Sequence, residues 1–197
     1  MNHLAHALLA SHADDAMVGA LLGDFVKGDD GRHYPPAVRF EIDLHRRIDV
    51  YTDAHPQVRE ALGRFSAGRR RFAGIALDVH FDHLLARDWS RHCDEPLPAF
   101  AARVYGALQR FGPPLPAALA QLSERLSRHD GLTAYRDFDT VVLALDRIAR
   151  RLSRGGDQLR ACEIDLRRES LPLAAHFDAF FPALRAFVAA ERARLKA

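Results

Sequence analysis

Residues 70–90 read RRFAGIALDVHFDHLLARDWS, and their apolar side chains would surround most of the helix that this stretch forms. A helix that is apolar on most sides has neighbours on most sides, so we expect it to be central. Asp78 and Asp82 nevertheless fall on the stripe that Ile75 and Leu85 share. Two carboxylates one turn apart on a buried face repel each other unless a cation or a shared proton lies between them. A metal ion is the simplest explanation.

Residues 43–53, DLHRRIDVYTD, carry a second charged stripe, because His45 and Asp49 continue the helical rhythm of Val38 and Ile42. A helical bundle can bring inward-facing residues from several helices together. The candidate ligands and proton-transfer groups on such faces are His6, Asp24, His45, Asp49, Asp78, Asp82 and His83. Their nitrogen and oxygen donors suit manganese, iron, zinc or magnesium without selecting among them.

Each candidate also has an ordinary structural explanation. Asp24 can end a helix before Gly28, and His6 can be a buried neutral histidine bonded to a carbonyl group. Asp49 can pair with Arg46 or with the arginine that follows it. A core with five or six uncompensated ionisable groups would be unlikely to fold, so the set as a whole favours a metal site.

Helical periodicity extends along nearly the whole chain, with no alternating strand pattern, so we expect an all-α helical bundle forming a single domain over residues 1–197. Proline and glycine mark the expected helix ends. The expected helices cover roughly 4–9, 14–25, 35–55, 56–68, 70–90, 96–111, 114–130 and 133–152, followed by a helical remainder interrupted at Pro172 and Pro182. Gly19, Gly23 and Gly28 indicate close packing of helices rather than a phosphate loop.

Composition narrows the function classes. The net charge is +2, and 26 of the 28 basic residues are arginine, which reflects either arginine-rich codon usage or binding of phosphate or an acidic partner. Cys93 and Cys162, without a disulfide framework, suit a reducing cytoplasm. We see no leader and no apolar run of about 18 residues, and expect neither a membrane nor a nucleic-acid partner. The lack of G-x-S-x-G, Cys-x-x-Cys and glycine-rich phosphate motifs disfavours covalent catalysis.

Four sequence blocks at compatible spacing carry a family resemblance. They are MN-x-LAH at the start, LLGDFVKG, PP-x-V followed by LHRRIDVYTD, and LDVHFDHLLARDW. Through them the chain resembles the acyl carrier protein phosphodiesterase family, which looks like a divergent relative of the metal-dependent HD-domain phosphohydrolases. The resemblance implies an all-α, HD-domain-like fold, although the adjacent pair here is Asp82-His83, the reverse of the His-Asp order.

The resemblance also implies a reaction: hydrolysis of the phosphodiester between 4′-phosphopantetheine and a serine of holo acyl carrier protein, with a divalent cation such as Mn²⁺. On this interpretation His6, Asp24, His45, Asp78 and Asp82 supply the metal ligands. The expected catalytic groups are Asp24, Asp49, His83 and Arg46. Asp49 or His83 would orient the attacking water or accept its proton, His83 would protonate the leaving oxygen, and Arg46 would neutralise charge on the phosphoryl group.

The partner implied is acyl carrier protein, a small acidic helical protein that would dock on a basic surface. The triplet 69–71, at the start of the central helix, is the docking surface we expect. Two other functions stay open on the residues alone. One is an HD-type hydrolase of a small phosphoester or nucleotide at the same metal site. The other is a non-catalytic helical module that binds an acidic protein, with its carboxylates held in salt bridges to arginine.

Overall fold

Every regular element in residues 1–196, the part of the chain that the computed structural model describes, is helical, which confirms the all-α class. The α-helices are α1 (His3–Leu9), α2 (Asp14–Leu22), α3 (Pro36–Ala54), α4 (Pro56–Gly63), α5 (Ala73–Arg87), α6 (Leu97–Arg110), α7 (Ala117–Arg128), α8 (Gly131–Ala134), α9 (Phe138–Ala149), α10 (Gly156–Arg168) and α11 (Ser170–Lys196). The 3-10 helices are η1 (Gly28–His33), η2 (Ala67–Phe72) and η3 (Trp89–Arg91).

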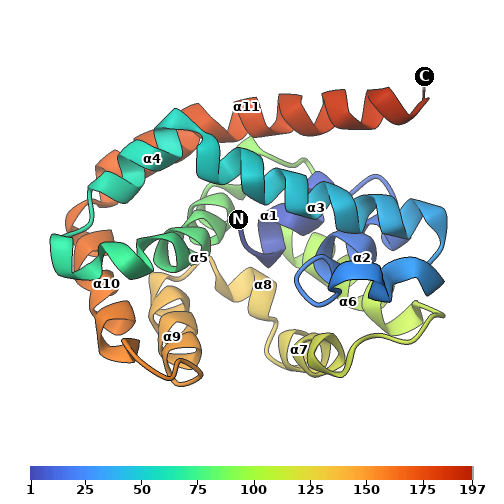
Figure 1. Ribbon diagram of the computed structural model, residues 1–197, viewed down its shortest axis with the longest axis horizontal. Coiled ribbons are helices and arrows are strands. Elements are labelled where there is room, and N and C mark those ends of the chain that lie inside the picture. The colour runs from blue at the N-terminus through green and yellow to red at the C-terminus, as the bar shows by residue number, and fades with distance from the viewer. Residues whose placement is uncertain (197) are drawn as a thin grey trace.

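Helix α5 lies among the other helices, as its sequence predicted (Figure 1). It contacts α1, α4, α9, α10 and α11. Leu77, Phe81 and Leu85 on α5 are almost completely buried, and Asp82 between them is fully buried as well. Because these neighbours come from both ends of the chain, α5 connects the N-terminal helices to the C-terminal ones.

Helix α2 packs against both α1 and α3, and these three helices carry most of the candidate site. Gly19 of α2 lies so close to α3 that a Cβ atom there would stand 2.8 Å from the carbonyl oxygen of Val38. The interpretation of Gly19 and Gly23 as close-packing positions is confirmed. Gly28 differs, because it begins η1 in open space with a positive φ of 53°, a conformation that favours glycine.

Two expected helices begin differently in the structure. Residues 69–71 belong to η2 rather than to the first turn of α5, so the central helix starts at Ala73. The helix expected over 133–152 divides into α8 and α9. The break arises because Asp137 caps α9, its side chain accepting a hydrogen bond of 3.0 Å from the backbone N–H of Asp139.

Helix α11 continues through both prolines that we expected to interrupt it. Pro172 lies in the first turn, where a backbone N–H has no partner within the helix in any case. Around Pro182, the side chains of Phe180, Phe181 and Leu184 are almost fully buried. Their packing against the core offsets the hydrogen bond that proline removes.

By length and composition alone, residues 170–194 of α11 would suffice to cross a membrane, although we expected no such segment from the sequence. Several large side chains of this segment are buried within the protein: Leu173, Phe177, Phe180, Phe181, Leu184 and Val188. An apolar helix in the core of a folded protein meets the same criterion, so the segment is weak evidence for a membrane span.

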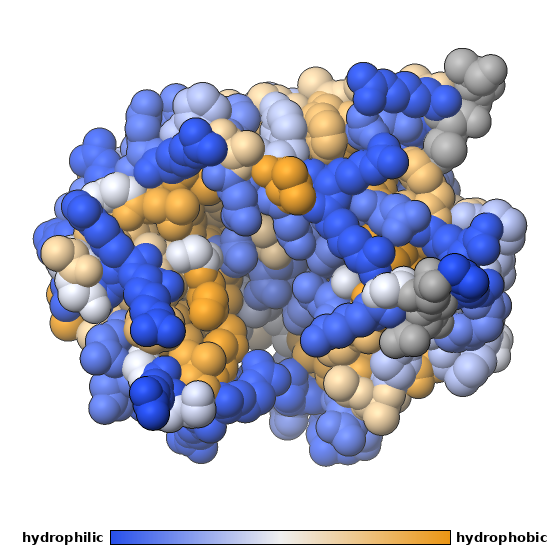
Figure 2. Space-filling model, in the orientation of Figure 1, coloured by the Kyte–Doolittle hydropathy of each residue, from blue (hydrophilic) through white to orange (hydrophobic). Residues whose placement is uncertain are grey.

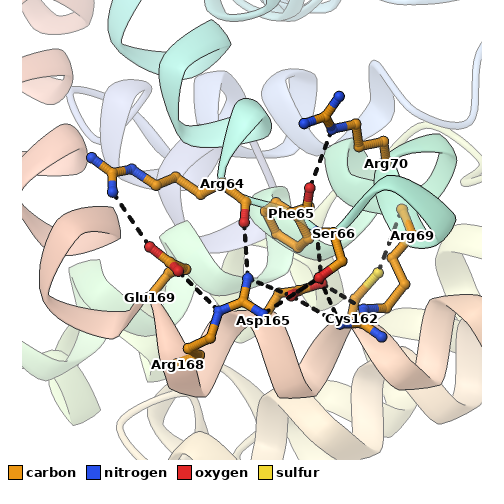
Figure 3. A network of polar contacts seen from close by, with 9 residues as sticks. All are labelled: Arg64, Phe65, Ser66, Arg69, Arg70, Cys162, Asp165, Arg168 and Glu169. Carbon is orange, nitrogen blue, oxygen red and sulfur yellow. Dashed lines mark hydrogen bonds and ion pairs between the residues drawn. The ribbon is translucent and has the colours of Figure 1, made fainter.

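A polar network around Asp165 of α10 holds η2 in place (Figure 3). Asp165 accepts hydrogen bonds from Arg69 Nε at 2.5 Å and from the Ser66 hydroxyl group at 2.8 Å. Arg168 adds an ion pair at 2.8 Å. Arg70 donates to a backbone carbonyl of the preceding turn at 3.2 Å. Two of the three arginines that we expected to form a docking surface are therefore engaged in holding the fold together.

We expect Asp165→Ala to lower the free energy of unfolding by about 3 kcal/mol, because it leaves Arg69 and Ser66 without their acceptor. The Arg69 hydrogen bond, against the effect of burial, lowers the pKa of Asp165 to about 2. The stabilisation is therefore present above the usual aspartate pKa and is lost as the pH falls through about 2.

The measurement is urea unfolding of Asp165→Ala and of a matched control, Asp157→Ala. Asp157 lies on the same helix, but its side chain is 96% exposed and pairs with Arg160 on the surface. We expect this control to change stability by less than about 0.5 kcal/mol. Equal losses in the two variants would contradict a structural role for the network.

Candidate metal centre

Two histidines and an aspartate from α1 and α3 converge on one point. His6, His45 and Asp49 each place a ligand atom within 4.8 Å of the others. Asp49 Oδ1 lies 3.2 Å from His6 Nε2, and Asp49 Oδ2 lies 3.2 Å from His45 Nε2. The two imidazole rings stack with their centroids 3.8 Å apart. Imidazole and carboxylate donors in this arrangement can hold a divalent transition metal.

Asp24 joins this group from the turn after α2. Its Oδ1 lies 3.3 Å from His45 Nε2, and its side chain is 43% exposed, whereas the side chain of His45 is only 3% exposed. We call His6, Asp24, His45 and Asp49 the metal cluster. The histidines form its buried side and the carboxylates its open side, so a ligand from solvent would approach past Asp24 and Asp49.

The orientation of His45 is fixed by the backbone of α2. Its Nδ1 lies 2.7 Å from the carbonyl oxygen of Ala20, a contact in which Nδ1–H donates and Nε2 is left to face the carboxylates. The ring lies directly against Gly23, where a Cβ atom would stand 2.2 Å from His45 Cγ. Glycine is therefore the residue that this approach allows at position 23.

Electrostatics give the cluster a preference for positive charge. Burial opposes protonation of His45, but Asp24 and Asp49 outweigh it and raise the pKa of His45 to about 9. Burial, with His45 nearby, lowers the pKa of His6 to about 4. Although burial acts in the opposite direction, His45 and His6 hold the pKa of Asp49 far below its usual range. Both carboxylates of the cluster stay ionised at neutral pH, since the pKa of Asp24 is lowered as well.

Asp78 of α5 reaches the edge of the cluster through the α-amino group of Met1. That group lies 3.0 Å from Asp78 Oδ1 and 3.6 Å from Asp49 Oδ1. Desolvation raises the pKa of Asp78, and the ammonium charge acts against this rise. The space between Asp78 and Asp49 is thus a position where positive charge is stabilised, next to the metal cluster.

Asp82 and His83, the adjacent pair on α5, have other partners. Asp82 Oδ2 accepts a hydrogen bond from Leu4 N–H at 2.8 Å, and Oδ1 accepts one from Ala5 N–H at 3.0 Å. Both oxygens therefore hold the first turn of α1. His83 Nδ1 lies 2.8 Å from the backbone oxygen of Tyr135. Both residues thus contact the backbone of other segments, and their expected roles as ligand and acid stay predictions.

Arg46 also points elsewhere. Its guanidinium group donates to the carbonyl oxygen of Val26 at 2.9 Å and pairs with Asp43 at 3.3 Å. It lines a separate pocket of about 640 Å³ beside η1 and α3. Its neighbour on α3, His45, faces the cluster, and successive residues on a helix point about 100° apart. The structure therefore shows no contact between Arg46 and the metal cluster.

His3 is a site residue that the sequence patterns did not single out. Its Nδ1 lies 3.6 Å from Asp24 Oδ2, and this nitrogen is buried without a hydrogen-bond partner. Desolvation by burial is the main reason why its pKa is lowered. The signal that could have found it is its position three residues before His6, on the same side of one helix. His3 occupies the variable position of the MN-x-LAH block, so the resemblance did not point to it.

We expect Asp82→Asn to lower the free energy of unfolding by about 2 kcal/mol, because an amide NH₂ group would face a backbone N–H that needs an acceptor. The loss should already be present in metal-free protein, measured by urea unfolding. Asp88→Asn, at the end of the same helix and paired with Arg87, is the control that should lose little. A loss confined to the Mn²⁺-loaded protein would make Asp82 a ligand instead.

Comparison with known proteins identifies the family. The model of a family described as acyl carrier protein phosphodiesterase matches residues 1–184, which include the whole metal cluster. The chain belongs to this acyl carrier protein phosphodiesterase family. Proteins named acyl carrier protein phosphodiesterase from Salmonella dublin, Salmonella agona and Salmonella newport are each 41% identical over 187 residues, covering 94% of this chain and 96% of theirs. No solved structure matches the chain, so its likeness to HD-domain hydrolases stays a prediction.

Proposed function

We propose that this member of the acyl carrier protein phosphodiesterase family hydrolyses the phosphodiester that joins 4′-phosphopantetheine to a serine of holo acyl carrier protein. The products would be apo acyl carrier protein and free 4′-phosphopantetheine. Family membership over residues 1–184, combined with the His6, His45 and Asp49 arrangement, is the observation that carries the proposal. We place the reaction in the cytoplasm, since the relatives named above come from bacteria and the proposed substrate is acyl carrier protein.

The residues of the metal cluster fit a divalent cation. Two imidazole nitrogens and the carboxylates of Asp24 and Asp49 converge, and a cation bound there would take the place of the Nε2 proton of His45. We propose Mn²⁺, with Mg²⁺, Fe²⁺ and Zn²⁺ as alternatives to be tested. When bound there, such a cation lowers the pKa of a water molecule and polarises a phosphoryl oxygen.

The protein's own groups would divide the remaining tasks. His6, His45 and Asp49 hold the cation in our proposal, because their ligand atoms lie closest together. Asp24 is ionised and open to solvent, so it can accept a hydrogen bond from the attacking water and orient it. Water must attack opposite the serine oxygen for that bond to break. The carrier protein would then lie on the outer side of the cluster, and the 4′-phosphopantetheine arm would point into the protein.

A basic surface along α3 supports docking of an acidic carrier. Arg39, Arg46 and Arg47 line the pocket of about 640 Å³ together with two further arginines. This surface joins the 69–71 triplet as a candidate for docking, since each contains paired arginines, such as Arg69 with Asp165 and Arg46 with Asp43. The alternative of a binding module whose carboxylates pair with arginine loses support, since the carboxylates of the cluster face histidine and an ammonium group.

The test is incubation of purified protein with holo acyl carrier protein and Mn²⁺, followed by intact-mass measurement of the carrier. We expect loss of the 4′-phosphopantetheine mass and no loss after chelation of the metal. A parallel reaction with a guanosine polyphosphate tests the competing hypothesis of a nucleotide hydrolase. Persistence of holo carrier with each of the four metals would exclude the proposed activity.

A further inference from the structure

A positively charged pocket opens beside the metal cluster, between α7, α8 and α9. It has a volume of about 320 Å³. Figure 1 places the N-terminus near these three helices, and Figure 2 shows the same face hollowed near its centre. Arg125 from α7, Arg147 from α9 and Arg151 just after α9 line the pocket. Three guanidinium groups from two separate segments thus surround one space.

No acidic partner of these three arginines is found among the described residues. Most other arginines near carboxylates are paired: Arg150, next to Arg151, forms an ion pair of 2.8 Å with Asp146. Arg147 and Arg151, on either side of the end of α9, line the same pocket and carry like charges. Arg147 and Arg151 also contribute to lowering the pKa of Arg125, after the larger effect of burial. Unpaired positive charge concentrated in a pocket indicates a site for an anion.

The pocket adjoins the metal cluster at the start of α1. Asn2 and His3 line it, and His3 Nδ1 lies 3.6 Å from Asp24 Oδ2 of the cluster. That nitrogen is buried and lacks a hydrogen-bond partner, and it faces the cluster at Asp24. His3 is therefore the residue through which the pocket and the cluster adjoin.

The remaining wall of the pocket is largely apolar and suits an uncharged chain. Leu122, Leu126, Ala144 and Ile148 contribute to it. A pocket with arginines on one side and apolar side chains on the other suits a ligand that has a phosphate group and an extended, mostly neutral arm. A nucleotide, by contrast, would bring an aromatic base. Apart from two histidines, the only described aromatic residue that lines the pocket is Tyr135, which is buried.

We propose that Arg125, Arg147 and Arg151 form the subsite that binds the phosphate group of 4′-phosphopantetheine, with its arm along the apolar wall. The inference rests on the proposed function for the identity of the ligand. Binding of a phosphate group by the three arginines, however, can be measured whether or not the protein hydrolyses the carrier. Guanidinium groups bind phosphate oxygens by paired, charge-assisted hydrogen bonds. The subsite would hold the phosphate group of the 4′-phosphopantetheine that is released by cleavage.

The experiment is calorimetric titration of 4′-phosphopantetheine, pantetheine and inorganic phosphate into Mn²⁺-loaded protein and into chelated protein. The variants are Arg147→Gln and the double variant that adds Arg151→Gln. Arg150→Gln is the matched control, since it removes one charge from the same segment but from a paired arginine. We expect the affinity for 4′-phosphopantetheine to fall about tenfold in Arg147→Gln and further in the double variant. The control should change it less than about twofold.

Pantetheine, which lacks phosphate, should bind all variants with the same weak affinity. Equal binding of 4′-phosphopantetheine to Arg147→Gln and Arg150→Gln would overturn the proposal. So would a rise in KM for holo acyl carrier protein without any change in 4′-phosphopantetheine binding, since the arginines would then contact the carrier's acidic side chains. If wild-type protein hydrolyses no holo carrier but binding of phosphate still depends on Arg147, the subsite stands and the proposed function fails.

Discussion

Asp49→Asn is expected to reduce turnover at least about 1,000-fold and to abolish tight Mn²⁺ binding, while the helical content stays unchanged. Asp49 is the carboxylate that contacts both histidines, with one oxygen 3.2 Å from His6 and the other 3.2 Å from His45. An amide keeps the shape of the side chain, but it loses the negative charge and one acceptor oxygen. The protein should remain folded because the side chain is 41% exposed and an amide of the same size can take its place.

Asp43→Asn is the matched control for this variant. It lies on the same helix, is exposed, and forms an ion pair with Arg46. Metal content after dialysis, thermal shift with Mn²⁺ and the intact-mass assay should separate the two variants clearly. Mn²⁺ binding by Asp49→Asn at wild-type affinity would contradict the placement of the metal, and an equal loss in Asp43→Asn would point to an effect of net charge.

The second large effect is expected from Gly23→Ala, which should lower Mn²⁺ affinity and turnover at least about 100-fold. The added methyl group would stand 2.2 Å from Cγ and 2.5 Å from Cβ of His45, so either α2 or the imidazole ring must move. His45 cannot turn away freely, because its Nδ1 is held by the carbonyl oxygen of Ala20. Displacement of a ligand by about 1 Å can cost roughly two orders of magnitude in rate. We expect a loss of stability of about 1–3 kcal/mol as well.

Gly74→Ala tests whether this effect is specific to the site. Gly74 lies in the first turn of α5, where a Cβ atom would have no neighbour within 4 Å, and its φ is in the ordinary range. Alanine there should stabilise the protein by about 0.5–1 kcal/mol and leave Mn²⁺ binding unchanged. Full activity of Gly23→Ala, measured by the same assays, would show that the helices can separate without disturbing His45.

The architecture was predictable because it depends on local patterns. The apolar sides of residues 70–90 require neighbours all round, and α5 has them. Proline residues at 36 and 56 start helices in the structure as in the sequence. Pro182 misled the prediction, since burial of the flanking phenylalanines outweighs the local cost of proline. Local preference decides an element only where tertiary packing does not oppose it.

The candidate site was predictable only as a set of inward-facing groups. Helical spacing puts Asp82 and Asp49 on buried stripes equally well, yet it does not tell a metal ligand from a carboxylate that caps another helix. The cap partners of Asp82, at Leu4 and Ala5, lie 78 and 77 residues away. The same limit applies to Arg147, because the fold decides that no acidic partner among the described residues reaches it. Sequence gives the face on which a residue lies, and the partner across the interface gives its role.

The attachment of α1 to α5 has a consequence for how the site assembles. Helix α1 has seven residues, which is too short to be stable in isolation, and Asp82 holds its first turn by two hydrogen bonds. His6 and His3 reach the cluster only when this helix is docked. Release of α1 would leave His45, Asp24 and Asp49 in place but open the cluster on one side. Metal affinity and the docking of α1 are therefore thermodynamically linked, so any sequence change that loosens the N-terminal turn should raise the metal concentration needed for activity.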